Sequence, residues 1–147
     1  MVLRRETVLG ATPDEVWTVV SDPGQLPRWW PGVTRVEEAT PEAWTSVLSS
    51  PRGKVVRADY TRVEAIARER LVWRQEVAGS PFERILASAL TTVSLAPANG
   101  GTKATVALEQ KPRGWARFAP LQFRAAGSRQ VRGAVDGLQA LFEGPAS

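Results

Sequence analysis

The sequence contains no histidine and no cysteine. Without imidazole, a Ser-His-Asp group and a histidine-based metal site are excluded, and no side chain has an ordinary pKa near neutrality. Without cysteine, disulfides, thiol nucleophiles and thiolate metal sites are excluded as well. An acid or base would have to be a carboxylate, a lysine, Tyr60 or a water molecule that these groups hold. Since there is also no glycine-rich phosphate loop and no calcium-binding spacing of carboxylates, we expect no metal ion and no cofactor.

Long apolar segments are also missing. No run approaches the roughly 18 apolar residues that a membrane-spanning helix needs. Met1 is followed by Arg4, Arg5 and Glu6 rather than by the apolar stretch of a secretory signal. We therefore expect a cytoplasmic protein without integral membrane association. The length of 147 residues predicts a single domain over residues 1–147 that can hold a core and a pocket.

Lysine is scarce, with 3 lysines against 16 arginines and a net charge of +4. The basic residues are scattered through every predicted element, so we do not expect a nucleic-acid partner. One concentration precedes the acidic Asp136, and it consists of Arg113, Arg117, Arg124, Arg129 and Arg132. Such a group is typical of a solvated helix face, and a weak contact with an anionic lipid or phosphate surface is the alternative. A third hypothesis for the function is a surface adaptor that uses this face toward anionic lipid or RNA.

The last third of the chain, residues 115–142, predicts one long amphipathic helix. Its apolar stripe recurs at spacings of three and four and comprises Phe123, Gly127, Val131, Ala134, Val135, Leu138, Leu141 and Phe142. A glycine inside a helix costs about 1 kcal/mol relative to alanine. Gly127, Gly133 and Gly137 therefore indicate either room for a ligand or close packing against the sheet. Pro120 either kinks the helix or separates residues 115–119 as a turn of their own.

The preceding residues alternate between strand and turn patterns. A strand at Val2–Leu9 is followed by two short helices, whose starts are marked by Thr12-Pro13 and Asp22-Pro23. Six further strands are predicted at Val33–Ala39, Ala43–Ser49, Lys54–Val63, Arg70–Val77, Arg84–Leu95 and Thr102–Gln110. Their connections, such as Ser50-Pro51-Arg52-Gly53, are rich in turn residues, and short connections favour antiparallel neighbours. The expected fold class is α+β, a seven-stranded antiparallel sheet wrapped around a long C-terminal helix, with two short helices after the first strand.

Several short motifs carry a resemblance to a known family. They are the segment Ala11-Thr12-Pro13-Asp14-Glu15-Val16-Trp17, the pair Asp22-Pro23, the segment Leu26-Pro27-Arg28-Trp29-Trp30-Pro31-Gly32-Val33, the turn Gly100-Gly101-Thr102 and the terminal Leu138-Gln139-Ala140-Leu141-Phe142-Glu143. With this order of elements, the chain resembles the START/Bet v 1-like superfamily (SRPBCC) with its helix-grip fold, and within it the bacterial polyketide cyclase/dehydrase-like branch. The resemblance implies a cavity between sheet and long helix, with its entrance near the short helices and the loops between strands.

Candidate site residues come from this expected cavity. A tryptophan beside a cavity can stack on a ligand and donate a hydrogen bond to it, and core packing is the alternative for each of the six. Gln75 is the polar member of an otherwise apolar strand face, and the alternation of residues 57–61 leaves open which face lines the cavity. An exposed pairing of Arg57 with Asp59 is the expected case there. The ligand-binding candidates are Trp17, Trp29, Trp30, Tyr60, Trp73, Gln75, Thr91, Phe123, Gly127 and Val131.

Two functions follow from these expectations. The first is binding of a small, mostly apolar molecule, such as a lipid, an isoprenoid or a polyketide, by a monomer or homodimer. The alternative is a polyketide cyclase or dehydratase, a lyase that uses neither histidine nor metal and acts by shaping its substrate and polarising a carbonyl. Arg57, Tyr60 and Gln75 are the candidate catalytic residues for this alternative.

Overall fold

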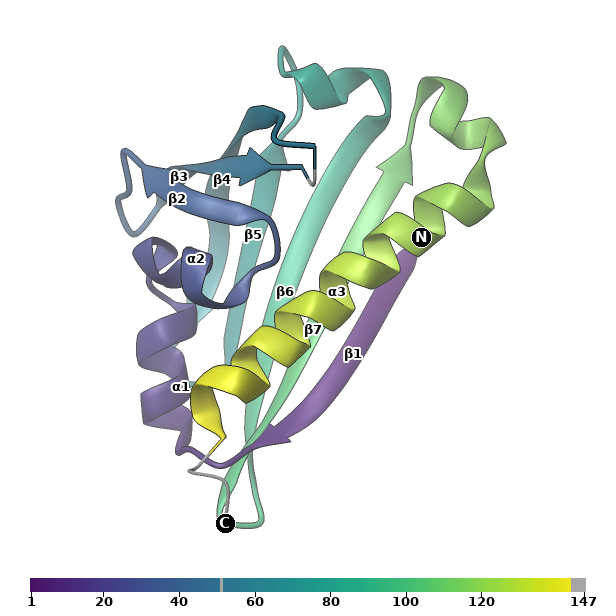
Figure 1. Ribbon diagram of the computed structural model, residues 1–147. Helices are drawn as coiled ribbons and strands as arrows, with labels where there is room; N and C mark the ends of the chain where they lie inside the picture. Colours follow the sequence, from purple (N-terminus) through teal and green to yellow (C-terminus); the bar gives the residue numbers. More distant parts are fainter. Residues whose placement is uncertain (51, 144–147) are drawn as a thin grey trace.

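The computed structural model describes residues 1–50 and 52–143. Seven strands form one antiparallel sheet in the order β1-β7-β6-β5-β4-β3-β2, and the helix α3 runs along one face of it (Figure 1). The strands are β1 (Val2–Leu9), β2 (Val33–Glu37), β3 (Ala43–Ser49), β4 (Val55–Ile66), β5 (Arg70–Glu76), β6 (Leu86–Ala98) and β7 (Gly101–Pro112). The helices are α1 (Pro13–Val20), η1 (Pro23–Gln25), α2 (Leu26–Trp29), η2 (Pro81–Arg84), η3 (Gly114–Phe118) and α3 (Pro120–Phe142), where η marks a 3-10 helix.

The predicted fold class is confirmed. The sheet is antiparallel throughout, the short helices follow β1, and the long helix ends the described chain. The helix starts have the expected local chemistry, because the Thr12 hydroxyl accepts a hydrogen bond from the Glu15 N–H at 3.2 Å and Asp22 Oδ1 accepts one from the Gly24 N–H at 2.9 Å.

Several element boundaries differ from the prediction, among them the start of β6 and the connection between β6 and β7. The strand expected from Arg84 begins at Leu86, because the Ser80 hydroxyl accepts a hydrogen bond from the Phe82 N–H at 3.2 Å and starts the turn η2 instead. The connection between β6 and β7 is also shorter than expected. Both strands continue through the turn-like residues at their ends, so that only Asn99 and Gly100 connect them.

The chain leading into the long helix is divided at Ala119. Residues Gly114–Phe118 form the separate turn η3, and Pro120 occupies the first position of α3. Proline suits that position because its missing N–H would have no partner there in any case. Of the two alternatives for Pro120, the structure therefore shows a helix start and no kink.

The buried side chains form two clusters of unequal size. The larger joins β1, β7 and the middle of the sheet to α1, α2 and α3. The smaller, which we call the distal core, consists of Val77, Leu86 and Ala89 with Phe82, Ile85 and Phe123 packed against them. It lies where η2 and the start of α3 meet the sheet, so that end of the molecule has its own small apolar support.

The helix glycines are explained by close packing. A Cβ at Gly137 would overlap the backbone carbonyl of Trp29, and a Cβ at Gly133 would lie 2.9 Å from Pro31 Cγ. At Gly127 a Cβ would overlap the Leu3 side chain on β1. Of the two alternatives for Gly133 and Gly137, the structure therefore shows close packing, although against α2 and the turn after it rather than against the sheet.

Two parts of the predicted organisation lie outside the described residues. They are Pro51 in the turn between β3 and β4 and residues 144–147 at the end of the predicted domain. Within the described chain, no helix combines the length and the apolar character needed to cross a membrane.

The contact between α3 and α2 is testable with two substitutions. Gly137→Ala adds a Cβ that overlaps backbone, so we expect the free energy of unfolding to fall by about 1–3 kcal/mol, even though alanine has the better helix propensity. Gly133→Ala should lose less unfolding free energy, since its added Cβ would meet the Pro31 side chain and not a backbone carbonyl. Urea denaturation of the two variants and the wild type measures both values. A Gly137→Ala protein as stable as the wild type would contradict the close approach.

Candidate functional site

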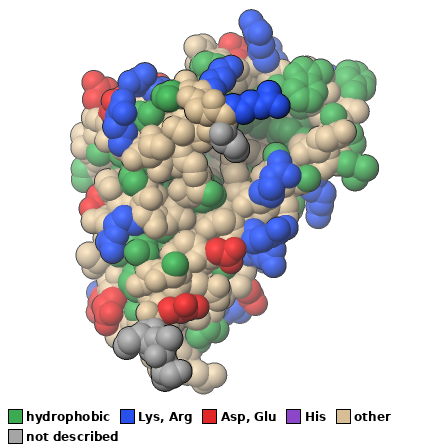
Figure 2. Space-filling model, in the orientation of Figure 1, with side chains coloured by type: hydrophobic (Ala, Val, Ile, Leu, Met, Phe, Trp, Pro, Cys, Tyr) green, Lys and Arg blue, Asp and Glu red, His purple; other side chains and the backbone are tan. Residues whose placement is uncertain are grey.

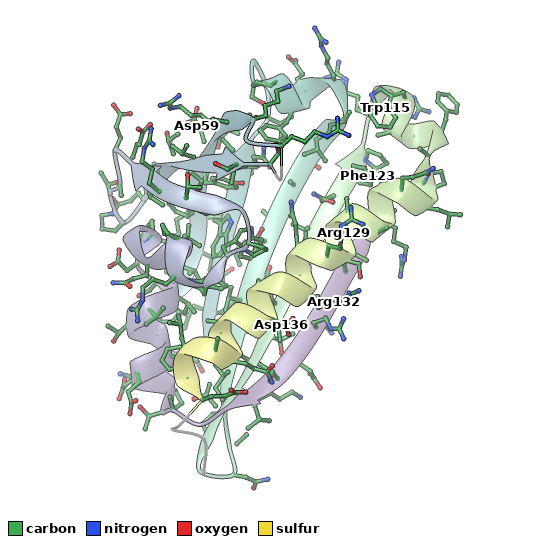
Figure 3. The ribbon with its side chains drawn as sticks, in the orientation of Figure 1. Asp59, Trp115, Phe123, Arg129, Arg132 and Asp136 are labelled. Carbon is green, nitrogen blue, oxygen red and sulfur yellow. The ribbon has the colours of Figure 1, made fainter. Side chains whose placement is uncertain are left out.

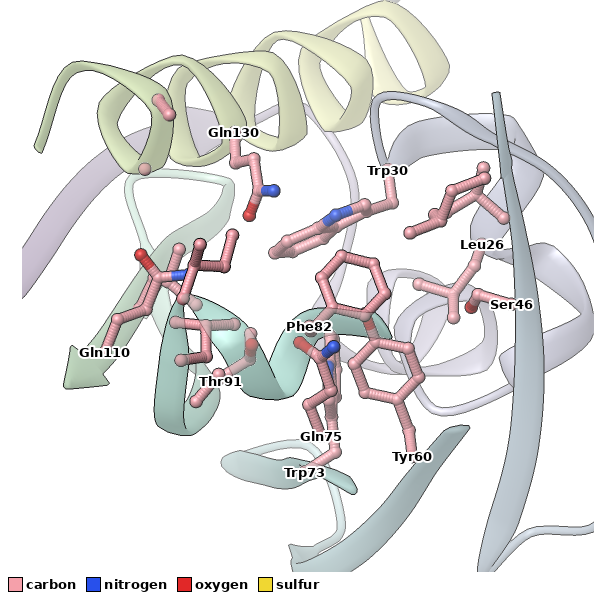
Figure 4. A pocket seen from close by; sticks show the side chains of 18 of the residues that line it. Leu26, Trp30, Ser46, Tyr60, Trp73, Gln75, Phe82, Thr91, Gln110 and Gln130 are labelled. Carbon is pink, nitrogen blue, oxygen red and sulfur yellow. The ribbon is translucent and has the colours of Figure 1, made fainter. Parts of the chain in front are cut away.

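A cavity of about 170 Å³ lies between the sheet, α3 and η2. Side chains of β3 to β7 form its floor, Leu26 and Trp30 close one side, and Phe123, Ala126, Gly127 and Gln130 of α3 lie across it. Figure 4 shows Gln130 reaching down from the helix, with Gln75, Tyr60 and Thr91 standing on the strands opposite. The expected position between the sheet and the long helix therefore holds a cavity.

Seven of the ten candidate ligand-binding residues line this cavity. They are Trp30, Tyr60, Trp73, Gln75, Thr91, Phe123 and Gly127. The other three belong to the packed core: Trp29 is 3% exposed, Val131 is 1% exposed, and Trp17 is half-buried against the larger cluster. Trp17 and Trp29 are candidates as tryptophans near the expected entrance, and Val131 as a member of the apolar stripe, but neighbouring side chains fill the space at all three positions.

The catalytic candidate Arg57 does not reach the cavity. Its side chain lies on the opposite face of β4, where its Nε donates to Glu37 at 2.8 Å. Hydrogen bonds from Arg57 and Arg35 hold the pKa of Glu37 below its usual value. Asp59, the expected partner of Arg57, instead accepts a hydrogen bond from the Thr45 hydroxyl at 2.6 Å. The exposed position of this face is as expected, but the pairing is different because β2 and β3 supply the partners.

One wall of the cavity is a row of aromatic rings in edge-to-face or stacked contact. The Trp30 and Trp73 rings are 5.8 Å apart, and the Trp73 and Trp44 rings are also 5.8 Å apart. Trp44 then stacks on Tyr60 at 5.7 Å with an angle of 16° between the rings. Each such contact contributes about 0.5–1.5 kcal/mol beyond the burial of area. The rings therefore fix the shape of this wall before any ligand binds.

Several lining residues were missed by reasoning from the sequence. Ser46 shares a strand face with Trp44 and Leu48, so the alternation along β3 contained the signal for it. Gln110 lies opposite Ala89 in the register of β7 with β6, which only the pairing of the strands reveals. Gln130 is exposed on α3 and had no apolar pattern to mark it.

The polar groups of the cavity are uncharged, and three of them are unpaired. None of the lining residues is Asp, Glu, Lys or Arg. Gln75 Nε2, Ser46 Oγ and Trp44 Nε1 are buried and have no hydrogen-bond partner among the described residues. A buried polar group without a partner costs about 1–3 kcal/mol, so a ligand group or water molecule that reached these atoms would recover that cost.

Tyr60 is the titratable residue of the lining. Tyr60 is half-buried between the aromatic wall and the cavity opening, and burial raises the pKa of Tyr60 to about 12. The hydroxyl therefore keeps its proton at neutral pH and acts as a hydrogen-bond donor. Gln75 lies directly opposite Tyr60 in the pairing of β4 with β5, so the two polar groups stand side by side on the cavity floor.

The cavity opens through its aromatic side into an outer hollow. Trp30, Leu48, Tyr60, Phe82 and Gln130 line both, and the hollow continues outward to Lys54. A molecule longer than the cavity could extend through this opening. The chemistry available to such a molecule is hydrogen bonding by neutral donors within an apolar enclosure. Among the described residues, no group of three acidic side chains is placed to hold a metal ion.

The architecture is the helix-grip class, a curved antiparallel sheet closed by a C-terminal helix over an apolar cavity. Residues 2–143 match the model of a family described as polyketide cyclase / dehydrase and lipid transport, and the chain belongs to this family. No curated protein sequence matches the chain.

Solved structures share this fold at low sequence identity. The di-domain ARO/CYC StfQ from the steffimycin biosynthetic pathway superposes with a TM-score of 0.77 at 16% identity, over 97% of this chain and 50% of that one. The di-domain ARO/CYC BexL from the BE-7585A biosynthetic pathway superposes with a TM-score of 0.78 at 16% identity, over 99% of this chain and 51% of that one. This chain thus spans about half the length of either di-domain protein. The protein CV1439 from Chromobacterium violaceum gives 0.70 at 22% identity, with 99% of both chains covered.

The state of Tyr60 can be measured directly, because it is the only tyrosine. Phenolate absorbance should show a midpoint near pH 12 in the folded protein and near pH 10 after denaturation. Between these values the unfolded chain loses a proton that the folded chain keeps, so stability falls as pH rises. Relative to Tyr60→Phe, the wild type should lose about 3 kcal/mol of unfolding free energy across this window. A folded midpoint near pH 10 would mean that the phenol is open to solvent.

Proposed function

We propose that this protein binds a small, mostly apolar molecule of lipid, isoprenoid or polyketide type, with a polar group at its buried end. The observation that carries the proposal is the set of three unpaired buried polar atoms in an uncharged apolar cavity. A ligand oxygen could accept from Gln75 Nε2 and Trp44 Nε1, and Ser46 Oγ could donate or accept. The family description, which names lipid transport beside polyketide cyclisation, supports the same class of ligand.

The size of the cavity limits what can be enclosed. An apolar cavity of about 150 Å³ accommodates one benzene ring, so the roughly 170 Å³ here suit one ring or a short branched chain. Ligand sites for larger molecules measure about 300–1,000 Å³. A longer ligand would therefore extend past Trp30 and Gln130 into the outer hollow.

Energetics favour an occupied cavity. At about 24 cal/mol per Å³, an empty cavity of this size costs about 4 kcal/mol, a large part of the stability of a domain. The unpaired polar atoms add to this cost. A ligand that fills the space and satisfies these atoms recovers both contributions, so binding should stabilise the protein strongly.

The lack of charge narrows the class of ligand. A carboxylate or ammonium group buried here would find no charged partner, and its desolvation would cost several kcal/mol. A ketone, an ester, an amide or a hydroxyl has no such cost and matches the neutral donors. We therefore infer that the buried end of the ligand is neutral, and that any charged group remains in the outer hollow near Lys54.

An enzymatic function is the second candidate, and the pairing of Tyr60 with Gln75 favours it. A phenol that stays protonated beside an amide N–H could polarise one carbonyl oxygen, as an oxyanion hole does. The cavity supplies no carboxylate or lysine as a general base, so such a reaction would depend on substrate shaping and on this polarisation. The ARO/CYC proteins StfQ and BexL share the fold and are the reason to try polyketide-like substrates.

Ligand binding is tested by native mass spectrometry of gently purified protein, followed by organic extraction and identification of the bound molecule. Ala125 and Ala126 are both exposed on α3, but Ala126 borders the cavity whereas Ala125 lies on the outer side of the helix. Ala126→Trp should narrow the cavity and reduce bound ligand at least about tenfold, whereas Ala125→Trp should bind like the wild type. Wild-type protein that carries no added mass and takes up no lipophilic dye would refute the proposal.

The enzymatic alternative is tested by turnover of polyketide-like substrates. Tyr60→Phe and Gln75→Leu should each lower turnover by about 10²–10³-fold, the loss typical of one oxyanion donor. Arg57→Gln is the matched control, because its side chain is on the opposite face of β4 and its loss should leave turnover unchanged. Full activity in both cavity variants would exclude this arrangement of roles.

A further inference from the structure

The end of the molecule formed by η3 and the first turn of α3 exposes three large apolar side chains. Trp115 is 67% exposed, Phe118 is 85% exposed and Leu121 is 79% exposed. Trp115 and Phe118 are three residues apart on η3 and share a side of that turn, and Leu121 follows them in the first turn of α3. Ala116 between them is 1% exposed and anchors the turn. Together they present on the order of 400 Å² of apolar surface, which is the size of the largest apolar patch on a typical soluble monomer, and such patches are often functional.

Trp115, Phe118 and Leu121 form what we call the apolar tip. Several arginines lie next to it along α3. Leu121, Arg124, Arg129 and Arg132 line one shallow hollow on the outer side of α3. Figure 2 shows apolar side chains gathered at the η3 end and basic side chains along α3, and Figure 3 shows Trp115, Arg129 and Arg132 following one another along this path. Arg117, Arg124, Arg129 and Arg132 form no salt bridge with the described residues.

The neighbouring strand adds to the same basic surface. Arg4 and Arg5 of β1 line a second hollow together with Arg124, and neither forms a salt bridge with a described residue. The one acid of that hollow, Glu6, pairs with Lys103 at 3.3 Å. The surface therefore attracts anions over the width of α3 and β1, and not at one isolated side chain.

The apolar tip and the basic surface beside it together narrow the class of partner. A nucleic acid would use the arginines but would gain little from exposed Phe118 and Leu121. Segments that lie in the headgroup region of an anionic bilayer typically combine tryptophan, phenylalanine and leucine with a basic helix face, as this surface does. We propose that Trp115, Phe118 and Leu121 insert into the surface of an anionic lipid bilayer while Arg117, Arg124, Arg129 and Arg132 contact its headgroups.

This docking would bring the cavity to the bilayer. The Arg113 N–H at the start of η3 donates to the Ile85 carbonyl at 2.8 Å, and the Arg113 guanidinium lies 3.8 Å from Glu83. Phe82 and Ile85 in the same segment line the cavity. The apolar tip is therefore joined directly to the segment beside the opening. The docking itself rests on surface residues and does not depend on which ligand the cavity holds.

Vesicle flotation of the full chain tests the proposal. The probes are vesicles of phosphatidylcholine alone and of phosphatidylcholine with phosphatidylglycerol. The wild type should float with the anionic vesicles and lose this binding at high salt. The variant Trp115→Ser/Phe118→Ser/Leu121→Ser should bind at least about tenfold more weakly. The variant Arg124→Gln/Arg129→Gln/Arg132→Gln should bind anionic vesicles about a hundredfold more weakly, since each arginine near an anionic surface raises the affinity about fivefold.

Two control variants test whether vesicle binding depends on this particular surface or only on the exposed apolar area and the net charge of the protein. Val63→Ser/Ile66→Ser removes two exposed apolar side chains from β4, and Arg28→Gln/Arg68→Gln/Arg70→Gln removes three charges from elsewhere. Both should bind within about twofold of the wild type. The proposal is overturned if the wild type does not float with anionic vesicles. It is also overturned if the serine variant floats like the wild type, because the arginines would then be a general polyanion site.

Discussion

One helix cannot cover a seven-stranded sheet, and the rest of this structure follows from that mismatch. A helix with its side chains is about 10 Å wide, whereas seven strands at about 4.8 Å spacing extend over roughly 29 Å. Here α3 packs mainly on β1 and β7 at one edge, and Gly133 and Gly137 fix its other contact, against Pro31 and Trp29. The strands β3 to β6 therefore keep an apolar face that the helix does not cover. Curvature of the sheet, the aromatic wall and η2 enclose the space that remains.

The enclosed space has polar atoms that stability alone would not favour. An apolar residue at the position of Gln75 would remove an unpaired amide from the interior, as would an alanine in place of Ser46. Proteins commonly retain such groups where a ligand supplies the missing partner. The aromatic rings beside them are in favourable contact with one another, so the wall is well packed while the polar atoms remain unpaired. This combination is typical of a preformed binding site.

The sequence predicts the framework well because the framework depends on local patterns. Alternation marks the strands, Thr12 and Asp22 mark the helix starts, and the spacing of Val131, Ala134 and Leu138 marks the buried side of α3. The cavity depends on distant pairing, and here prediction was partial. Tyr60, Trp73 and Gln75 could be named from their strands, but Gln110 and Gln130 enter through strand register and helix position. Trp29 lies in the packed core rather than in the cavity lining, and a glycine more than 100 residues away brings the helix onto its backbone.

The two unequal cores divide the molecule into parts of different local stability. The larger cluster holds α1, α2 and most of α3 on the sheet, whereas η2 and the start of α3 rest on the distal core. The free energy of opening a segment depends only on the contacts that the segment itself loses. For regions with few buried contacts, this free energy is far smaller than the global free energy of unfolding. The residues beside the cavity opening can thus separate while the contact of Gly137 with Trp29 stays intact. A molecule too large for the opening can enter or leave the cavity through this local unfolding, with the rest of the fold unchanged.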